Sequence, residues 1–152
     1  MRFSPCNGAQ WTLDTTFRGS MYGYGAVDQY GYTVALDGEW AAVGAYGKNP
    51  GSGDFTGEVR IYRKVAGIWT DFQVVRASNG FFYDWFGASL ALDGNRLVVG
   101  AQRADNYSGA SFVGGEAYVF DFDTPSSPGV WSETAQLFPP QGAVGAYFSS
   151  SI

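Results

Sequence analysis

Residues 30–45 read YGYTVALDGEWAAVGA, and residues 86–101 read FGASLALDGNRLVVGA. The two stretches lie 56 positions apart, and eight of their sixteen residues are identical. The similarity continues in the same order, because GEVRIY at 57–62 aligns with GEAYVF at 115–120. An ordered series of matches at a nearly constant period indicates an internal structural repeat.

Each repeat divides into four short apolar segments. In the first repeat these are residues 32–36, 41–45, 58–62 and a segment that begins near Trp69. In the second repeat they are residues 88–92, 97–101, 116–120 and a segment that begins near Trp131. The first two segments are separated by Asp37-Gly38 or by Asp93-Gly94, and Asp-Gly between apolar runs is a strong hairpin-turn signal. Four antiparallel strands in each repeat of this length are typical of a β-propeller blade, so we predict an all-β fold of propeller blades.

Partial copies of the repeat lie on both sides of the two complete ones. Trp11-Thr12 resembles Trp69-Thr70, and Phe148–Ile152 aligns with residues 86–90. We therefore expect one propeller segment over residues 1–152. Its predicted parts are a partial blade with the third and fourth strands (1–29), two full repeats (30–85 and 86–147) and the start of a further blade (148–152).

The run FG, then S-x-A-L-D-G, then VVGA resembles the FG-GAP repeat of integrin alpha-subunit propellers and of many bacterial surface proteins. The likeness is greatest to the bacterial variety, which has a short Asp-Gly turn. It implies a propeller and a role at the cell surface or outside the cell. The sequence departs from the family pattern where Tyr46 and Gln102 stand in place of the proline of "GAP".

Composition and charge argue against several functions. The net charge is −5 with only nine basic residues, so we expect no nucleic-acid partner. The chain has no histidine, which removes the commonest catalytic base and zinc ligand, and its single cysteine allows no disulfide within the chain. The first residues, MRFSPCNGAQW, lack the apolar region of a signal peptide, and no apolar run has the length of a membrane span.

The sequence predicts no cofactor, and calcium is the alternative ligand. Integrin-type repeats often carry several acidic residues in the first turn, whereas Asp37 and Asp93 each supply one carboxylate, too few for calcium. Asp54 and Asp105, in the loops between the second and third strands, are the candidate metal ligands. The alternative is that both lie in solvated, Gly-rich loops.

The candidate ligand-binding residues are aromatic residues of the loops: Tyr22, Tyr24, Tyr83, Trp85 and Tyr107. Aromatic side chains on a propeller rim can stack on sugars or anchor peptides. The alternative is that they pack between neighbouring blades. Asp28 and Asp84 precede the two strand starts by two positions, where each carboxylate either contacts a ligand or accepts backbone hydrogen bonds in the turn.

A closed propeller has about four to eight blades, and the predicted strands make fewer than three. The ends are complementary, because Phe148 and Ile152 belong to a first strand, whereas Phe3 and Trp11 belong to third and fourth strands. We therefore hypothesise a homodimer that forms a six-bladed ring.

The preferred function is a non-catalytic binding or adhesion module for a protein or glycan. The alternatives are a propeller-type glycan-processing enzyme, which can work with Asp and Glu alone, or a structural assembly unit.

Overall fold

The computed structural model describes residues 15–18, 28–49, 55–104, 114–123, 128–140 and 148–152, and these residues form β-strands and loops without a helix. The strands of the first sheet are β1 (Tyr30–Asp37), β2 (Trp40–Ala45), β3 (Glu58–Val65) and β4 (Ile68–Val75). Those of the second are β5 (Phe86–Asp93), β6 (Arg96–Ala101), β7 (Glu116–Asp123) and β8 (Val130–Leu137). No helix that could cross a membrane occurs among these residues.

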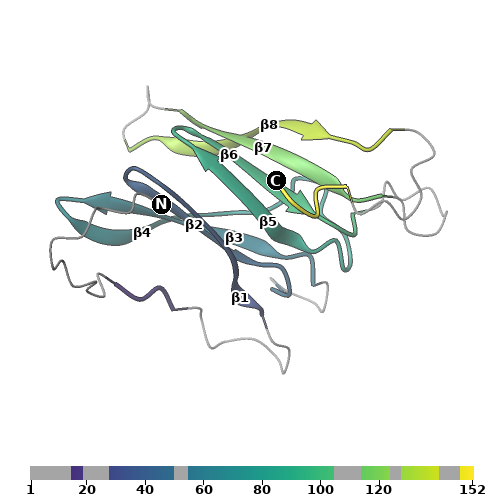
Figure 1. Ribbon diagram of the computed structural model, residues 1–152, viewed down its shortest axis with the longest axis horizontal. Coiled ribbons are helices and arrows are strands. Elements are labelled where there is room, and N and C mark those ends of the chain that lie inside the picture. Colours follow the sequence, from purple (N-terminus) through teal and green to yellow (C-terminus); the bar gives the residue numbers. More distant parts are fainter. Residues whose placement is uncertain (1–14, 19–27, 50–54, 105–113, 124–127, 141–147) are drawn as a thin grey trace, which may run out of the picture.

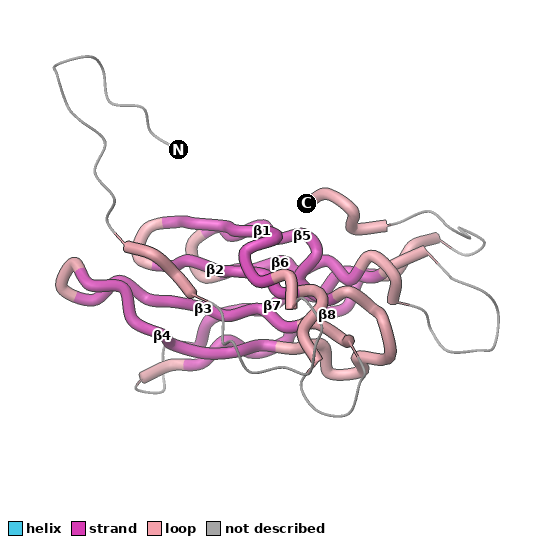
Figure 2. The backbone as a smooth tube through the Cα atoms, turned by 90° about the horizontal axis from the view of Figure 1, so that it is seen from below, coloured by secondary structure: helices cyan, strands magenta, loops and turns pink. Residues whose placement is uncertain are grey.

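Each sheet is an antiparallel meander in which sequential strands are neighbours, in the orders β1-β2-β3-β4 and β5-β6-β7-β8. The predicted all-β fold with four antiparallel strands per repeat is therefore confirmed. We call the sheets blade 1 and blade 2. The described strands form no closed ring, and the two blades lie face to face (Figures 1 and 2).

The hairpin turn between the first two strands of each blade lies one residue later than the Asp-Gly pair indicates. Asp37 is the last residue of β1 and pairs with Trp40, so the two turn residues are Gly38 and Glu39. Gly38 has a φ of 55°, which a residue without a Cβ adopts at little cost. Blade 2 repeats this arrangement with Gly94, whose φ is also 55°.

The main hydrophobic core lies between the two blades. One face of blade 1 contributes Trp40, Ala42, Val59, Ile61 and Val75, and the facing side of blade 2 contributes Phe86, Leu97, Val99, Tyr118, Phe120 and Trp131. The aromatic rings form an edge-to-face cluster, in which the ring of Trp40 lies 5.0 Å from that of Phe72 and 5.3 Å from that of Trp131. Such contacts add to the free energy of apolar burial, so the interface between the blades stabilises the fold.

The opposite face of blade 1 is only partly covered. Phe17 stacks on Tyr62 with ring centroids 4.2 Å apart and meets Trp69 edge-on at 5.7 Å. The side chains of Tyr32, Val34 and Leu36 on β1 remain 58%, 69% and 68% exposed. We call the surface formed by these three residues the open β1 face.

Candidate functional site

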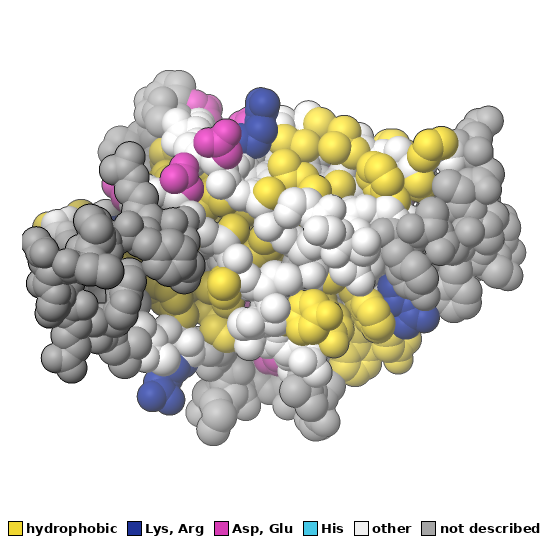
Figure 3. Space-filling view, in the orientation of Figure 1, with side chains coloured by type: hydrophobic (Ala, Val, Ile, Leu, Met, Phe, Trp, Pro, Cys, Tyr) yellow, Lys and Arg dark blue, Asp and Glu magenta, His cyan; other side chains and the backbone are white. Residues whose placement is uncertain are grey.

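The strands of each blade alternate in direction, so the starts of β1, β3, β5 and β7 lie at the same end of the sheets as the ends of β2, β4, β6 and β8. The loops that join β2 to β3, β4 to β5 and β6 to β7 are therefore at this end. The short hairpin turns are at the other end (Figure 1). We call the first end the loop rim. In the view of Figure 3, hydrophobic side chains lie in several patches, one of them at the lower right, toward this end of the sheets.

Trp85, a predicted ligand-binding residue, lies between the two blades at the loop rim. Its ring is 5.1 Å from the ring of Tyr46, which follows β2. The guanidinium group of Arg103, which follows β6, lies over the Trp85 ring at 4.6 Å. Tyr46 in turn meets Tyr32 edge-on at 4.6 Å. These contacts favour the packing alternative for Trp85.

Tyr83, the other predicted ligand-binding residue that the structure describes, is more accessible. One face of its ring stacks on Phe55, with centroids 5.3 Å apart and an interplanar angle of 15°. Its side chain is nevertheless 52% exposed, and the neighbouring Phe81 and Phe82 are 42% and 50% exposed. The loop therefore presents three consecutive aromatic side chains to solvent, and we call Phe81, Phe82 and Tyr83 the aromatic loop.

Three bulky residues at the loop rim have left-handed backbone conformations. The φ angles are 44° for Phe55, 63° for Tyr83 and 61° for Trp85. Such conformations are uncommon for large side chains and cost on the order of 1–3 kcal/mol each. Strain of this kind persists only where surrounding contacts enforce it, and it is concentrated at ligand-binding positions in proteins.

Asp84 holds the aromatic loop in place. Its Oδ2 accepts a hydrogen bond from the backbone N–H of Phe81 at 2.6 Å, and its carbonyl oxygen accepts one from the N–H of Arg103 at 3.1 Å. The side chain is buried, so Asp84 has the turn-capping role that was one of its two predicted alternatives. The hydrogen bonds fix the loop backbone before any ligand binds, which lowers the entropic cost of binding.

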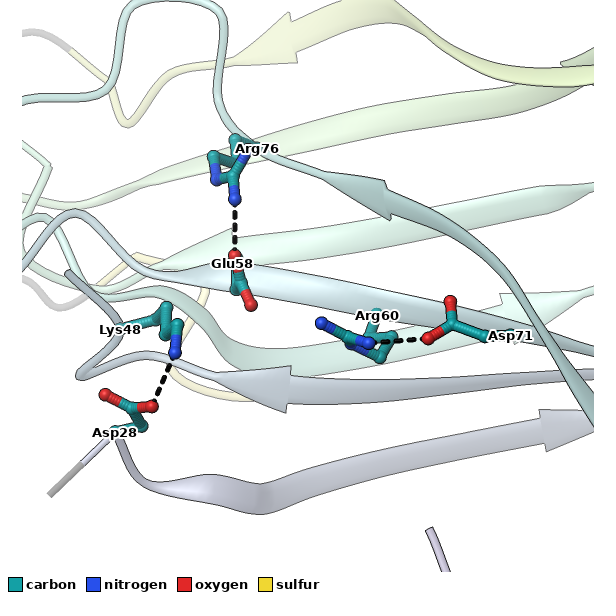
Figure 4. Close-up of polar contacts among 6 residues, drawn as sticks. All are labelled: Asp28, Lys48, Glu58, Arg60, Asp71 and Arg76. Atoms are coloured by element: carbon teal, nitrogen blue, oxygen red, sulfur yellow. Dashed lines mark hydrogen bonds and ion pairs between the residues drawn. The ribbon is translucent and has the colours of Figure 1, made fainter. Parts of the chain in front are cut away.

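Ion pairs support the loop rim from blade 1 (Figure 4). Lys48 donates to Asp28 at 2.6 Å, so this aspartate joins the segment before β1 to the loop after β2. Arg76 donates to the buried carboxylate of Glu58, also at 2.6 Å. A carboxylate that is buried in this way requires such a partner, so the pair fixes the loop after β4 to the start of β3.

The equivalent buried carboxylate in blade 2 is that of Glu116, and it has a different partner. The hydroxyl of Tyr118 donates to Glu116 at 2.8 Å and also lies 2.8 Å from Oδ1 of Asn79, in the loop between the blades. Burial, followed by this hydrogen bond to Glu116, raises the pKa of the Tyr118 hydroxyl. The group therefore stays protonated and keeps donating at any ordinary pH.

Several predicted site residues lie outside the described residues, namely Tyr22, Tyr24, Tyr107, Asp54, Asp105, Phe3 and Trp11. The ligand-binding, metal-binding and closure roles of these residues therefore stay predictions. Within the described part of the chain, no group of three or more His, Cys, Asp or Glu side chains could hold a metal ion.

Three residues that the sequence did not single out also belong to the rim: Tyr46, Phe55 and Arg103. The sequence does carry a signal for Tyr46, because this residue replaces the proline of the repeat pattern. In the structure its ring fills the space between the blades. Phe55 and Arg103 gave no periodic signal, since they lie in loops and meet their partners only through the docking of one blade on the other.

A family model described as FG-GAP repeat matches residues 23–62 and 69–120, which together are more than half of the chain. The first match includes β1 and β2 and ends within β3. The second begins in β4, includes the loop between the blades together with β5 and β6, and ends within β7. No curated protein matches the sequence significantly.

Proposed function

The chain belongs to the FG-GAP repeat family, and from this premise we propose that it is a non-catalytic propeller module that binds a protein or glycan through its loop rim. The observation that carries the proposal is the aromatic loop. Phe81, Phe82 and Tyr83 are between 42% and 52% exposed, although the backbone beneath them is fixed by Asp84. Exposed aromatic side chains on a fixed backbone are suited to anchoring a partner.

The same surface suits two kinds of ligand. The free faces of aromatic rings can stack on the C–H faces of sugars, and the rings can also fill apolar pockets of a protein. We propose that adhesion at a cell surface is the biological setting, as the resemblance to integrin-like and bacterial surface repeats implies.

A glycan array together with a pull-down against surface proteins tests this proposal. We expect a ligand whose binding is lost with Phe82→Ala or Tyr83→Ala. Ile68→Ala serves as the matched control, since Ile68 is 68% exposed but lies beside the hairpin turn at the opposite end of blade 1. Turnover of a glycan, lost on replacing one Asp or Glu, would instead indicate an enzyme. If these assays detect neither ligand binding nor glycan turnover, a structural assembly unit is favoured.

We further propose that the ring is completed by a second copy of the chain, giving six blades. The support is the open β1 face, where apolar side chains that a neighbouring blade would cover lie in solvent. Light scattering on a sizing column should give a mass near twice 16.4 kDa. A folded monomer would contradict this part of the proposal and would leave the rim-binding part intact.

A further inference from the structure

The contact that joins blade 2 to blade 1 has a specific hydrogen-bonding pattern at the start of β5. The N–H of Phe86 donates to the carbonyl of Thr56 at 3.0 Å, and the hydroxyl of Thr33 donates to the carbonyl of Gly87 at 2.7 Å. Gly87 has a φ of 88°, and its backbone lies directly against Gly44 of β2. We call this arrangement the blade junction.

Residues 148–149 repeat the blade junction on blade 2. The N–H of Phe148 donates to the carbonyl of Gly114, and the hydroxyl of Ser89 donates to the carbonyl of Ser149. Ser149 takes the place of Gly87 and has a φ of 69°. Its own hydroxyl donates to the carbonyl of Glu116 at 2.7 Å, so a side chain is accommodated at this left-handed position.

The start of β1 has the same shape, but none of the residues that the structure describes docks on it. Gly31 is the repeat equivalent of Gly87 and has a φ of 86°, yet a Cβ placed on it would meet nothing within 4 Å. The open β1 face follows directly. Of its equivalents on β5, Leu90 and Leu92 pack against the core between the blades and Ala88 is buried, whereas Tyr32, Val34 and Leu36 are each more than half exposed.

By the pattern of the two junctions, the group that would pair with the start of β1 is a hydroxyl two residues after the left-handed residue of a first strand. Thr33 and Ser89 supply it at the two junctions described above. Ser151 lies two residues after Ser149, in the same register, and it is exposed. The hydroxyl of Ser151 is therefore the donor that follows those of Thr33 and Ser89 in the repeat.

The start of β1 and Ser151 of the same chain lie on opposite outer sides of the two-blade stack. Blade 2 packs on the face of blade 1 that carries Trp40 and Ala42, whereas the open β1 face lies on the other side of that sheet. Residues 148–149 dock on the side of blade 2 that faces away from blade 1, against Ser89 and Gly100. Ser151 therefore does not reach Gly31 of its own chain, whereas a second copy can supply it.

We propose that Ser151 of one copy donates to the carbonyl of Gly31 of a second copy, and that residues 148–152 begin to cover the open β1 face of that copy. This inference rests on the proposed two-chain ring and names the seam at which the ring closes. Each copy gives one Ser151 and receives one, so two copies form a closed assembly with two equivalent seams.

Disulfide trapping tests the seam. In a Cys6→Ser background, we mix a Gly31→Cys variant with a Ser151→Cys variant under mild oxidation. A hydroxyl within hydrogen-bonding distance of a backbone carbonyl places the two Cβ positions within reach of a disulfide. Ser89→Cys with Ser149→Cys in one chain is the positive control, because both positions already carry a side chain at an observed junction. Gly38→Cys mixed with Ser151→Cys is the negative control, since Gly38 lies at the opposite end of β1.

The expected result is a reducible species of two chains from the Gly31→Cys and Ser151→Cys mixture and none from the negative control. If the positive control forms and light scattering shows a dimer, but this mixture does not cross-link, the seam is wrong and the proposed dimer survives. A monomer that forms no cross-link overturns both. A ladder of longer oligomers contradicts the two-chain ring.

Discussion

The carboxylate of Asp37 accepts a hydrogen bond from the backbone N–H of Gly94 at 2.7 Å, so the hairpin turn of blade 1 is tied to the hairpin turn of blade 2. Asp37 was predicted as a turn residue, and the bond gives its side chain a role between the repeats. Its repeat equivalent, Asp93, has no side-chain hydrogen bond to any residue that the structure describes.

Asp37→Ala should therefore destabilise the protein more than Asp93→Ala does. We expect Asp37→Ala to lower the free energy of unfolding by about 0.5–1.5 kcal/mol, since it leaves the Gly94 N–H to water. Asp93→Ala should change it by less than about 0.5 kcal/mol, as is usual for an exposed surface position. Urea denaturation of both variants measures the difference. Equal midpoints would show that the link between the turns contributes nothing.

The blade junction depends on the absence of a side chain at Gly44. A Cβ there would overlap the carbonyl of Gly87 and the hydroxyl of Thr33, and Gly44 does not have a left-handed φ, so the cost is purely steric. Gly44→Ala should reduce stability by about 1–3 kcal/mol, as overpacking does.

Gly80→Ala is the matched control, because its φ is not left-handed and a Cβ would make ordinary contacts at 3.5 Å. It should be neutral or stabilise by up to about 1 kcal/mol, because the unfolded chain loses freedom. Thermal melts should thus show a lower melting temperature for Gly44→Ala and an equal or higher one for Gly80→Ala. A Gly44→Ala melt that matches the wild type would argue against close docking of the blades.

Much of the fold could be predicted from the repeat, because strand number, order and direction follow from the pattern of apolar segments and turns. The differences between equivalent positions could not. Trp40 and Arg96 occupy the same place in the repeat, yet Trp40 lies in the core between the blades, whereas Arg96 pairs with Asp121 at 2.7 Å on the outer side of blade 2. Which face a neighbour covers depends on stacking, which no single repeat encodes.

The candidate site was partly predictable for the same reason. The aromatic character of residues 79–85 was evident in the sequence, but the contacts of Tyr83 and Trp85 with Phe55 and Tyr46 arise only when loops of different repeats meet. Several acidic side chains, with one basic group beside them, lie instead at the upper left of Figure 3.

Replacing Trp40 and Arg96, which are equivalent in the repeat, should change the free energy of unfolding by very different amounts. Trp40→Ala removes a side chain that is 4% exposed and contacts three aromatic rings, so we expect a loss of about 3–5 kcal/mol. Arg96→Ala removes an exposed ion pair, and such pairs contribute about 0–1 kcal/mol. Chemical denaturation measures both. Similar losses would mean that the outer side of blade 2 is also buried in solution.

The outer strands of the two blades are joined by Gln73 of β4. Its amide donates to the carbonyl of Trp131 at 2.8 Å and accepts from the N–H of Trp131 at 2.9 Å. Gln73→Ala breaks both bonds and should cost about 1–3 kcal/mol, because the Trp131 backbone groups are part-buried. Gln102→Ala, which loses one bond of 3.3 Å at an exposed site, should cost less than about 0.5 kcal/mol. Urea midpoints of the two variants compare these effects, and equal shifts would exclude a joining role for Gln73.

Alkaline pH should destabilise the protein through Tyr118. Burial and the hydrogen bond to Glu116 raise the pKa of this hydroxyl in the folded state, whereas a tyrosine of the unfolded chain ionises near pH 10. The unfolded state therefore loses its proton first, so the stability that this group contributes is complete below about pH 10 and decreases as the pH rises further. Tyr118→Phe should be less stable than the wild type at neutral pH by about 1–3 kcal/mol, because the buried Glu116 loses a donor.

The same variant should lose less of its remaining stability than the wild type between neutral pH and about pH 11, because it lacks the titrating group. Urea midpoints measured across this range give both quantities. Tyr32→Phe, at a position 58% exposed, is the control and should follow the wild type throughout. Parallel curves for Tyr118→Phe and the wild type would show that the Tyr118 hydroxyl does not govern the alkaline limit, and the second tyrosine with a raised pKa, Tyr30, would then be the residue to replace.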